Sequence, residues 1–279
     1  MVNYKVKGLY KDREVSVVVP VHNEEKTLDQ CLTSIRKQRS VGEIVVVLDR
    51  CEDNSEKIAR KHAEQDPRVK ILHFNKHVFK TNYCAETANF GILKAKNDIV
   101  CTVDADTVLG KDYISSLLPY LKRPTASVSG RLFPRHKRLL QFFETIGGTG
   151  RIFLRPIWNE AGGLQDIMSC DTLFDLNLLK KHYDFKVVET AVMYDVRDYS
   201  MTQLIRQAIR RGRGRRHIGQ SFSFMLGHSL YCLTKTPFGF IELLANITGY
   251  LTTRRRTSRR DMKLYETRRM REIVKKLMR

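Results

Sequence analysis

The sequence predicts an α/β fold with a mostly parallel central sheet flanked by helices. Short β-branched runs, of the length typical of buried strands, alternate with segments whose apolar residues recur at helical spacing. Polar clusters follow three of these runs, as expected where parallel strands end at one edge of a sheet. The 279 residues suffice for one large or two small domains, and the apolar fraction of 42% is ordinary for a globular protein.

The alternation of strands and helices can be followed in order along the first half of the chain. The expected strands are residues 15–21, 43–48, 69–74, 99–103 and 128–133, and the expected helices are residues 27–38, 56–66, 83–96 and 112–121. Asp53-Asn54-Ser55 can cap the second helix, and Pro67 and Pro124 stop the second and the fourth. Helices of this length between strands favour parallel pairing with right-handed crossovers.

The most informative motif is Asp104-Ala105-Asp106, which directly follows the apolar run of residues 99–103. Alone it could be an ordinary Asp-rich turn. However, polar clusters also follow the first two expected strands, and two carboxylates at a shared sheet edge suit a divalent cation that holds a diphosphate. The chain has no Gly-x-Gly-x-x-Gly or Gly-Lys-Ser/Thr loop beside these strands, so a cation and side chains would have to hold the phosphates.

Charge and cysteine content narrow the class of protein further. The net charge is +20, and it is concentrated in residues 206–217 and 251–279. Such basic blocks attract the phosphates of nucleotides, nucleic acids or anionic lipids. The six cysteines form no Cys-x-x-Cys pair, which favours reduced thiols in a cytoplasmic protein over a zinc site or a disulfide framework. The first eight residues lack the apolar core of a signal peptide.

Three motifs in sequence order carry a resemblance to a known family. They are the segments of residues 15–25 (VSVVVPVHNEE), 45–55 (VVVLDRCEDNS) and 103–107 (VDADT). Over roughly residues 13–217 the chain resembles the family 2 glycosyltransferases of the GT-A fold, which are inverting and use nucleotide-diphosphate sugars. We therefore expect a GT-A domain over residues 1–217, with a donor-binding half at about 13–125 and an acceptor-binding half at about 126–217. Residues 218–279 would form a helical C-terminal region.

The resemblance implies roles for residues at the three strand ends. Pro20 and His22 would line the nucleobase pocket, Glu24 would lie near the ribose or base, and Asp49 would accept a hydrogen bond from the base. Asp104 would contact ribose or phosphate, and Asp106 would coordinate Mn²⁺ or Mg²⁺ bridging the diphosphate. Other interpretations remain open, because Glu24 could be a favourable acid at a helix N-terminus and Asp49 could cap a turn. Asn89 is interpreted as an exposed helix residue, and Lys80 is interpreted as a surface lysine.

Inversion by a single displacement needs a general base for the acceptor hydroxyl. Cys170-Asp171 resembles the Glu-Asp that opens a helix in the family, with Cys170 in place of Glu. Asp171 is therefore the expected base and also a natural N-cap, and Asp166 is the alternative base. If the acceptor were itself a phosphate, as in a polyprenyl-phosphate glycosyltransferase, no base would be needed.

An arginine-rich helix is expected to end at Gly212 and Gly214. Its Gln207-Ala-Ile-Arg210-Arg211 resembles the Gln-x-x-Arg-Trp of processive synthases, with Arg211 in place of Trp, which argues against processivity. Arg210 and Arg211 would still bind the leaving diphosphate, because guanidinium groups suit phosphate oxygens. A sugar nucleotidyltransferase would carry a glycine-rich loop after its first strand. Here the glycines lie at residues 147–150, and we interpret them as a flexible turn.

The C-terminal region combines apolar and basic segments. The apolar run of residues 222–251 is interrupted too often to reach the length of about 20 residues that a spanning helix needs. It could form core helices or lie at a membrane surface. The basic amphipathic segment that follows suits anionic lipid. We expect a cytoplasmic enzyme, peripheral at the inner face of the membrane, that transfers a sugar to a glycan, lipid-linked saccharide or small glycoside. A basic nucleic-acid-binding protein on an inactive transferase scaffold is the alternative, although no nucleic acid is expected because the acidic strand ends would repel it.

Overall fold

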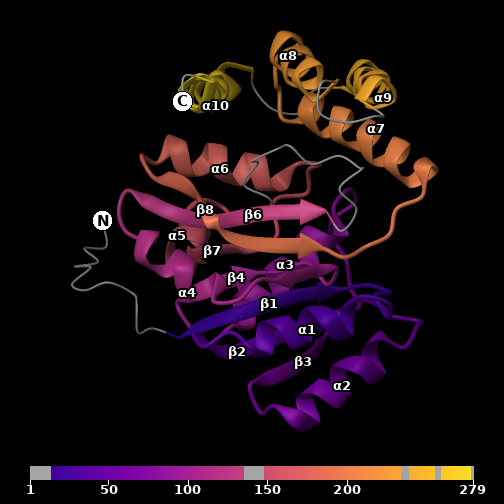
Figure 1. The fold of residues 1–279 in the computed structure, drawn as a ribbon, viewed down its shortest axis with the longest axis vertical. Coiled ribbons are helices and arrows are strands. Elements are labelled where there is room, and N and C mark those ends of the chain that lie inside the picture. The colour runs from indigo at the N-terminus through magenta and orange to yellow at the C-terminus, as the bar shows by residue number, and fades with distance from the viewer. Residues whose placement is uncertain (1–13, 135–147, 234–238, 255–258, 278–279) are drawn as a thin grey trace.

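The computed structural model describes residues 14–134, 148–233, 239–254 and 259–277 (Figure 1). The first eight residues, discussed above, lie outside them. An eight-stranded sheet forms the centre of this part of the chain. Its strands are β1 (Val15–Val21), β2 (Val41–Leu48), β3 (Val69–His73), β4 (Ile99–Thr102), β5 (Thr107–Leu109), β6 (Thr125–Pro134), β7 (Arg151–Leu154) and β8 (Asp184–Asp195).

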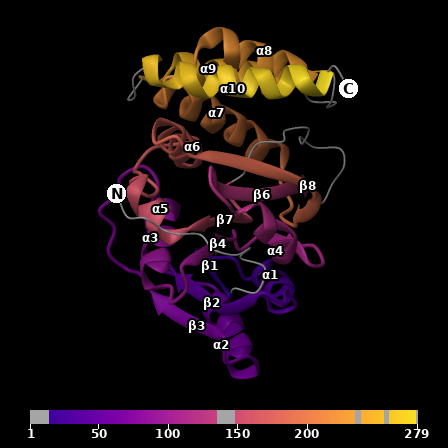
Figure 2. The same cartoon turned by 90° about the vertical axis from the view of Figure 1, so that its left-hand side faces the viewer.

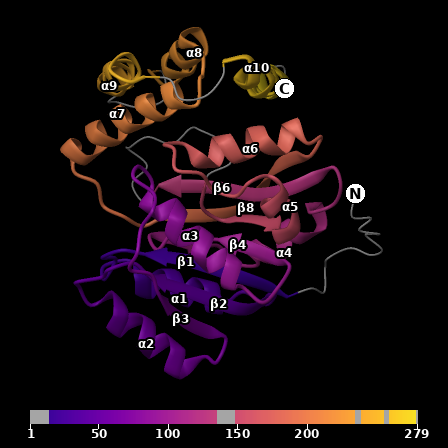
Figure 3. The same cartoon turned by 180° about the vertical axis from the view of Figure 1, so that it is seen from behind.

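Helices cover both faces of the sheet, as predicted. They are α1 (Leu28–Arg36), α2 (Ser55–Gln65), α3 (Tyr83–Lys94), α4 (Tyr113–Leu117), α5 (Arg155–Glu160), α6 (Cys170–Lys180), α7 (Met201–His217), α8 (Phe222–Leu233), α9 (Gly239–Leu251) and α10 (Arg259–Leu277). Figures 1 and 3 show α1 on one side of the sheet and α3 and α5 on the other. The α/β class and the elements expected between residues 15 and 133 are confirmed.

The alternation of side chains along β1 shows why the sheet is covered on both faces. Val17 and Val19 pack into the core beneath α1 and α2, whereas Val18, between them, packs into the core beneath α3 and α5. All three valines are fully buried. Because successive side chains of a strand point to opposite faces, a continuous β-branched run is what a strand between two helical layers requires.

The order of the strands explains how the site is assembled. The sheet runs β3-β2-β1-β4-β7-β6-β8-β5, with β3, β2, β1 and β4 parallel to one another. β7 lies antiparallel between β4 and β6, and β8 is parallel to β6. The carboxyl ends of β1, β2, β4 and β8 therefore lie at one edge of the sheet, together with the beginning of β7. The antiparallel strands of the second half were not predicted.

Helices α8, α9 and α10 form an outer layer at the end of the molecule opposite α2, with α7 beneath them (Figures 1 and 2). The prediction that Gly212 and Gly214 end the arginine-rich helix was wrong, since α7 continues to His217. A Cβ at Gly212 would collide with the backbone oxygen of Asn246 in α9, and one at Gly249 would collide with that of Ile209. These glycines serve close helix packing rather than helix termination.

Candidate active site

Four carboxylates gather where the carboxyl ends of β1, β4 and β8 meet. We call Glu24, Asp104, Asp106 and Asp195 the acidic cluster. Burial raises the pKa of Asp104 to about 7, and the neighbouring charge of Asp106 adds to the shift. Burial also raises the pKa of Glu24 and of Asp195, again with a contribution from Asp106. Like charges held this close in a desolvated site call for a cation.

Arg197 places a positive charge within this cluster. Arg197 Nε lies 3.0 Å from Asp106 Oδ2, and Arg197 Nη2 forms an ion pair with Glu24 Oε1. The Arg197 backbone N–H donates to Asp195 Oδ1 at 2.9 Å. Asp195 also accepts a hydrogen bond from the Tyr199 hydroxyl at 3.1 Å. Sequence reasoning missed Asp195, Arg197 and Tyr199, although they too follow the end of a strand.

The glycine-containing turn before β7 lies at the same edge. Thr149 is buried, and its Oγ1 accepts the backbone N–H of Asp104 at 2.9 Å. Thr102 Oγ1 donates to the Gly148 carbonyl at 3.1 Å. Residues 148–150 form a bend, in agreement with the interpretation as a turn, and these hydrogen bonds tie the bend to the end of β4; Gly147 lies outside the described residues. The turn fixes the backbone that carries Asp104.

Asp171 lies in the first turn of α6 and is half-buried. Its charge helps burial and Asp106 to raise the pKa of Asp104, whereas Arg197 opposes the shift. Asp171 therefore lies near the acidic cluster. The expectation that Asp171 is the N-cap was wrong, because Ser169 occupies that position. A Cβ added at Gly148 would lie 3.8 Å from the Asp171 Cβ, an ordinary van der Waals contact, so the two residues are neighbours. The Cys170 thiol accepts the Asn82 amide at 3.1 Å.

The residues expected at the nucleobase lie beside the acidic cluster, at the ends of β1 and β2. Pro20 is buried in β1, His22 is exposed, and His22 Nδ1 lies 2.7 Å from the Asp49 carbonyl oxygen. The Asp49 carboxylate is buried and binds three side chains: Arg50 Nε and His77 Nε2 at 2.8 Å and Thr87 Oγ1 at 3.2 Å. Although desolvation opposes the shift, Arg50 and His77 hold the pKa of Asp49 below its usual value.

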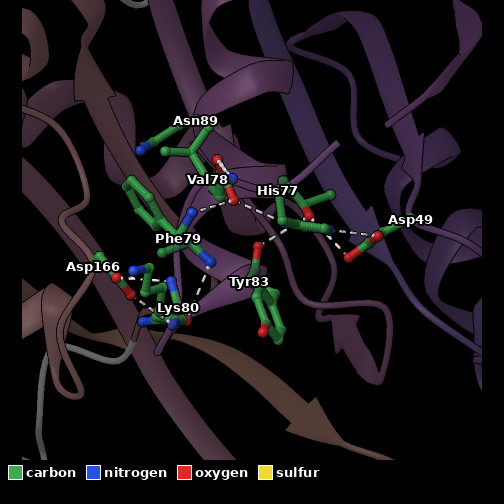
Figure 4. Close-up of polar contacts among 12 residues, drawn as sticks. Asp49, His77, Val78, Phe79, Lys80, Tyr83, Asn89 and Asp166 are labelled. Atoms are coloured by element: carbon green, nitrogen blue, oxygen red, sulfur yellow. Dashed lines mark hydrogen bonds and ion pairs between the residues drawn. The ribbon is translucent and has the colours of Figure 1, made fainter. Parts of the chain in front are cut away.

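His77 connects Asp49 to a loop that sequence reasoning did not single out (Figure 4). Its Nε2 faces Asp49 Oδ1, and its Nδ1 faces Glu86 Oε2, both at 2.8 Å. Glu86 then accepts the backbone N–H groups of Val78 and Phe79 at 2.8 and 3.1 Å. The position of Asp49 is thus coupled to the loop before α3.

The far end of this loop is held by Asp166, the alternative base. Its carboxylate accepts the backbone N–H groups of Lys80, Thr81 and Asn82 at 2.8, 2.7 and 2.9 Å (Figure 4). Asn89, expected to be an exposed helix residue, is instead half-buried and exchanges hydrogen bonds with the backbone of Leu164. Both residues therefore fasten the segment before α6 to α3 and its preceding loop.

The two arginines expected at the diphosphate lie in different surroundings. Arg211 forms an ion pair with the buried Glu242 of α9 at 2.6 Å, so the structure does not bring it to the acidic cluster. Arg210 is exposed on α7. Desolvation and Asp104 raise the pKa of Cys84 in α3, whereas Arg210 opposes the shift. The Cys84 thiol is therefore within electrostatic reach of both Arg210 and Asp104.

The carboxylates fit a cation that brings further ligands with it. Within the described ranges, no group of three or more His, Cys, Asp and Glu side chains is arranged to hold a metal ion by itself. The cluster nevertheless presents hard oxygen atoms, and Arg197 supplies positive charge at Asp106. One or two carboxylates completed by phosphate oxygens are a usual setting for Mg²⁺ or Mn²⁺.

Residues 16–161 match the family described as glycosyl transferase family 2. Glycosyltransferase GlyG of Streptococcus pneumoniae serotype 4 is 34% identical over 115 residues, 41% of this chain and 37% of that protein. An N-acetylglucosaminyltransferase of Bradyrhizobium elkanii is 34% identical over 114 residues, 39% of this chain and 60% of that protein. The chain thus matches less than two thirds of the length of either relative.

Two solved structures share the fold at low sequence identity. The mannosyltransferase PcManGT from Pyrobaculum calidifontis, in complex with GDP-Man and Mn²⁺, superposes with a TM-score of 0.61 at 19% identity, covering 88% of this chain and 72% of that one. S. aureus TarS 1–349 in complex with UDP-GlcNAc gives 0.58 at 14% identity, covering 90% and 83%. At such identities the likeness concerns the fold.

Proposed function

Because the chain belongs to glycosyl transferase family 2, we propose that it moves a sugar, with inversion, from a nucleotide-diphosphate donor to an acceptor hydroxyl. The observation that carries this proposal is the acidic cluster, with Asp49 at the end of the strand next to β1 and with Asp171 close enough to influence Asp104. A cation at Asp106 would neutralise the departing diphosphate when bound. The two solved structures with the same fold are complexes with GDP-Man and with UDP-GlcNAc, which supports a nucleotide-sugar donor.

The proposed reaction is a single displacement at the anomeric carbon. Asp171 takes the proton of the acceptor hydroxyl as its oxygen bonds to that carbon, and the bond from the carbon to the diphosphate oxygen breaks with its electron pair on the diphosphate. Pro20, His22 and Asp49 would hold the nucleobase, and Glu24 and Asp104 the ribose or phosphate. Arg210 would assist the diphosphate. We no longer assign that role to Arg211, because it is paired with Glu242.

The substitution Asp106→Asn tests the metal-supported binding of the sugar donor. We expect the Mn²⁺-dependent affinity for UDP or GDP to fall about 10- to 100-fold, as losses at a metal site typically do. Calorimetric titration of each nucleotide with and without Mn²⁺ measures this, and whichever nucleotide binds identifies the donor's base. Asp98→Asn is the matched control, since Asp98 directly precedes the opposite end of β4.

Unchanged affinity in Asp106→Asn would contradict the role of Asp106. Binding of a single-stranded oligonucleotide that falls steeply with salt, without metal-dependent binding of either nucleoside diphosphate, would contradict the transferase mechanism as a whole.

We also propose that the outer helical layer binds anionic membrane and that the acceptor is membrane-linked. None of the helices in the described residues is both long and apolar enough to cross a bilayer. Exposed positions of α9 nevertheless form one helical stripe, where Phe240, Leu244 and Leu251 are 64, 49 and 67% exposed. No charged side chain is exposed among the described residues of α8 and α9, whereas Lys263 and Arg271 are exposed on α10. An apolar stripe beside basic side chains is the pattern of an interfacial surface.

Vesicle flotation tests this surface. We expect wild-type protein to bind vesicles with anionic lipid more than neutral ones, and Leu244→Glu to lower the bound fraction severalfold because it places charge in the apolar stripe. The control is Leu93→Glu on α3. Leu93 is also largely exposed, at 60%, but it does not belong to the outer helical layer. Equal partition between the two kinds of vesicle, or equal effects of the two substitutions, would contradict the proposal.

A further inference from the structure

The reaction proposed above assigns no role to Arg197, although this residue lies within the acidic cluster. Its guanidinium contacts Asp106 and Glu24, the ends of two different strands. Its main chain is anchored on both sides: the Val196 N–H donates to the Asp106 carbonyl at 2.9 Å, and the Arg197 N–H donates to the Asp195 carboxylate. The backbone is therefore fixed at the cluster, and the side chain, 38% exposed, is the part that can turn.

A guanidinium and a divalent cation would compete for the place beside the Asp106 carboxylate. Both neutralise the Asp106 carboxylate, and they repel each other wherever no anion lies between them. A diphosphate removes the conflict, because it supplies oxygens to the metal and also to a guanidinium fork. Metal alone should therefore bind against Arg197, whereas metal with a nucleoside diphosphate should bind with it.

We propose that Arg197 is the counter-ion of the acidic cluster before the sugar donor binds, and that it turns onto the donor's diphosphate when a divalent cation takes Asp106. Arg197 is thus a further donor-binding residue that couples the two ligands. This inference rests on the proposed function, since it needs a diphosphate to be the partner of the cation.

The substitution Arg197→Gln should shift two affinities in opposite directions. Without nucleotide, Mn²⁺ should bind about tenfold more tightly, because its competitor is gone; with saturating Mn²⁺, UDP or GDP should bind about tenfold more weakly, within the usual range of coupling between two ligands. Mn²⁺ binding is followed by electron paramagnetic resonance of the free ion, and nucleotide binding by calorimetry. Neither measurement depends on turnover.

Two further variants separate coupling from a structural role. Arg197→Lys retains one positive charge without the planar fork, so its Mn²⁺ affinity should stay near that of wild type while nucleotide affinity falls. Arg206→Gln removes an exposed arginine from α7 and should change neither affinity. The melting temperature of Arg197→Gln should fall in metal-free buffer and recover with Mn²⁺, because a bound cation replaces the lost charge.

The inference is overturned if Arg197→Gln weakens both affinities or changes neither, since competition requires opposite signs. Failure of the proposed function has a different signature, namely that wild-type protein binds neither nucleoside diphosphate in the presence of Mn²⁺. In that case the titration with Mn²⁺ alone still decides whether Arg197 competes with a cation.

Discussion

Asp171→Asn should lower the rate of sugar transfer about 10³-fold, the scale on which a positioned general base contributes. An amide is almost isosteric with the carboxylate but cannot accept the hydroxyl proton. Asp171 lies on α6, outside the acidic cluster, and is not proposed to contact the donor, so the affinity for nucleoside diphosphate with Mn²⁺ should change far less than the rate of transfer. Nucleoside diphosphate released in the presence of acceptor measures transfer, and calorimetry measures binding.

Asp166→Asn is the informative comparison, because Asp166 was the alternative base. Its carboxylate accepts three backbone N–H groups, so the substitution should loosen residues 80–82 and leave transfer within about tenfold of wild type, the loss of about one hydrogen bond. If Asp166→Asn removed transfer and Asp171→Asn did not, the base would be Asp166. If both kept full transfer, the acceptor would be a phosphate, which needs no base.

The first half of the fold could be predicted because it depends on local patterns. β1 and the second part of β2, residues 44–48, are rich in β-branched and other apolar residues and are buried on both faces, and each strand is followed by a helix with apolar residues at helical spacing. β8 differs, since Lys186 and Glu189 interrupt it, and β7 is only four residues long. The place of β7 between β4 and β6 depends on pairing between distant segments, which no local pattern encodes.

The residues of the candidate site likewise fall into those that local sequence patterns predict and those that they do not. Asp49, Asp104 and Asp106 could be proposed because each directly follows a recognisable strand of the parallel half. Arg197 follows β8, and its partners come from the ends of β1 and β4, so its role becomes visible only when the mixed sheet brings these ends together. The polar cluster Asp195-Val196-Arg197 is a signal of the same kind, and it would have been found had β8 been recognised as a strand.

The largest expected effect on stability comes from an ion pair buried between the sheet and α6. Arg151 Nη1 and Nη2 lie 2.7 and 3.2 Å from the two carboxylate oxygens of Asp175, and both side chains are almost fully buried. Asp175→Leu leaves the Arg151 guanidinium buried without this carboxylate, so the free energy of unfolding should fall by about 3–5 kcal/mol. Urea denaturation followed by circular dichroism measures the change.

The double variant Arg151→Met/Asp175→Leu should recover most of that loss, because removing both charges removes the desolvation cost as well as the attraction. A double variant no more stable than Asp175→Leu would show that packing, and not charge, sets the cost. The pH dependence gives an independent check. Burial raises the pKa of Asp175 to about 6, although Arg151 opposes the shift. The folded state therefore binds more protons at Asp175 than the unfolded state between about pH 4 and 6. This group then makes wild-type stability fall as pH rises through that window, and the double variant should lack its contribution.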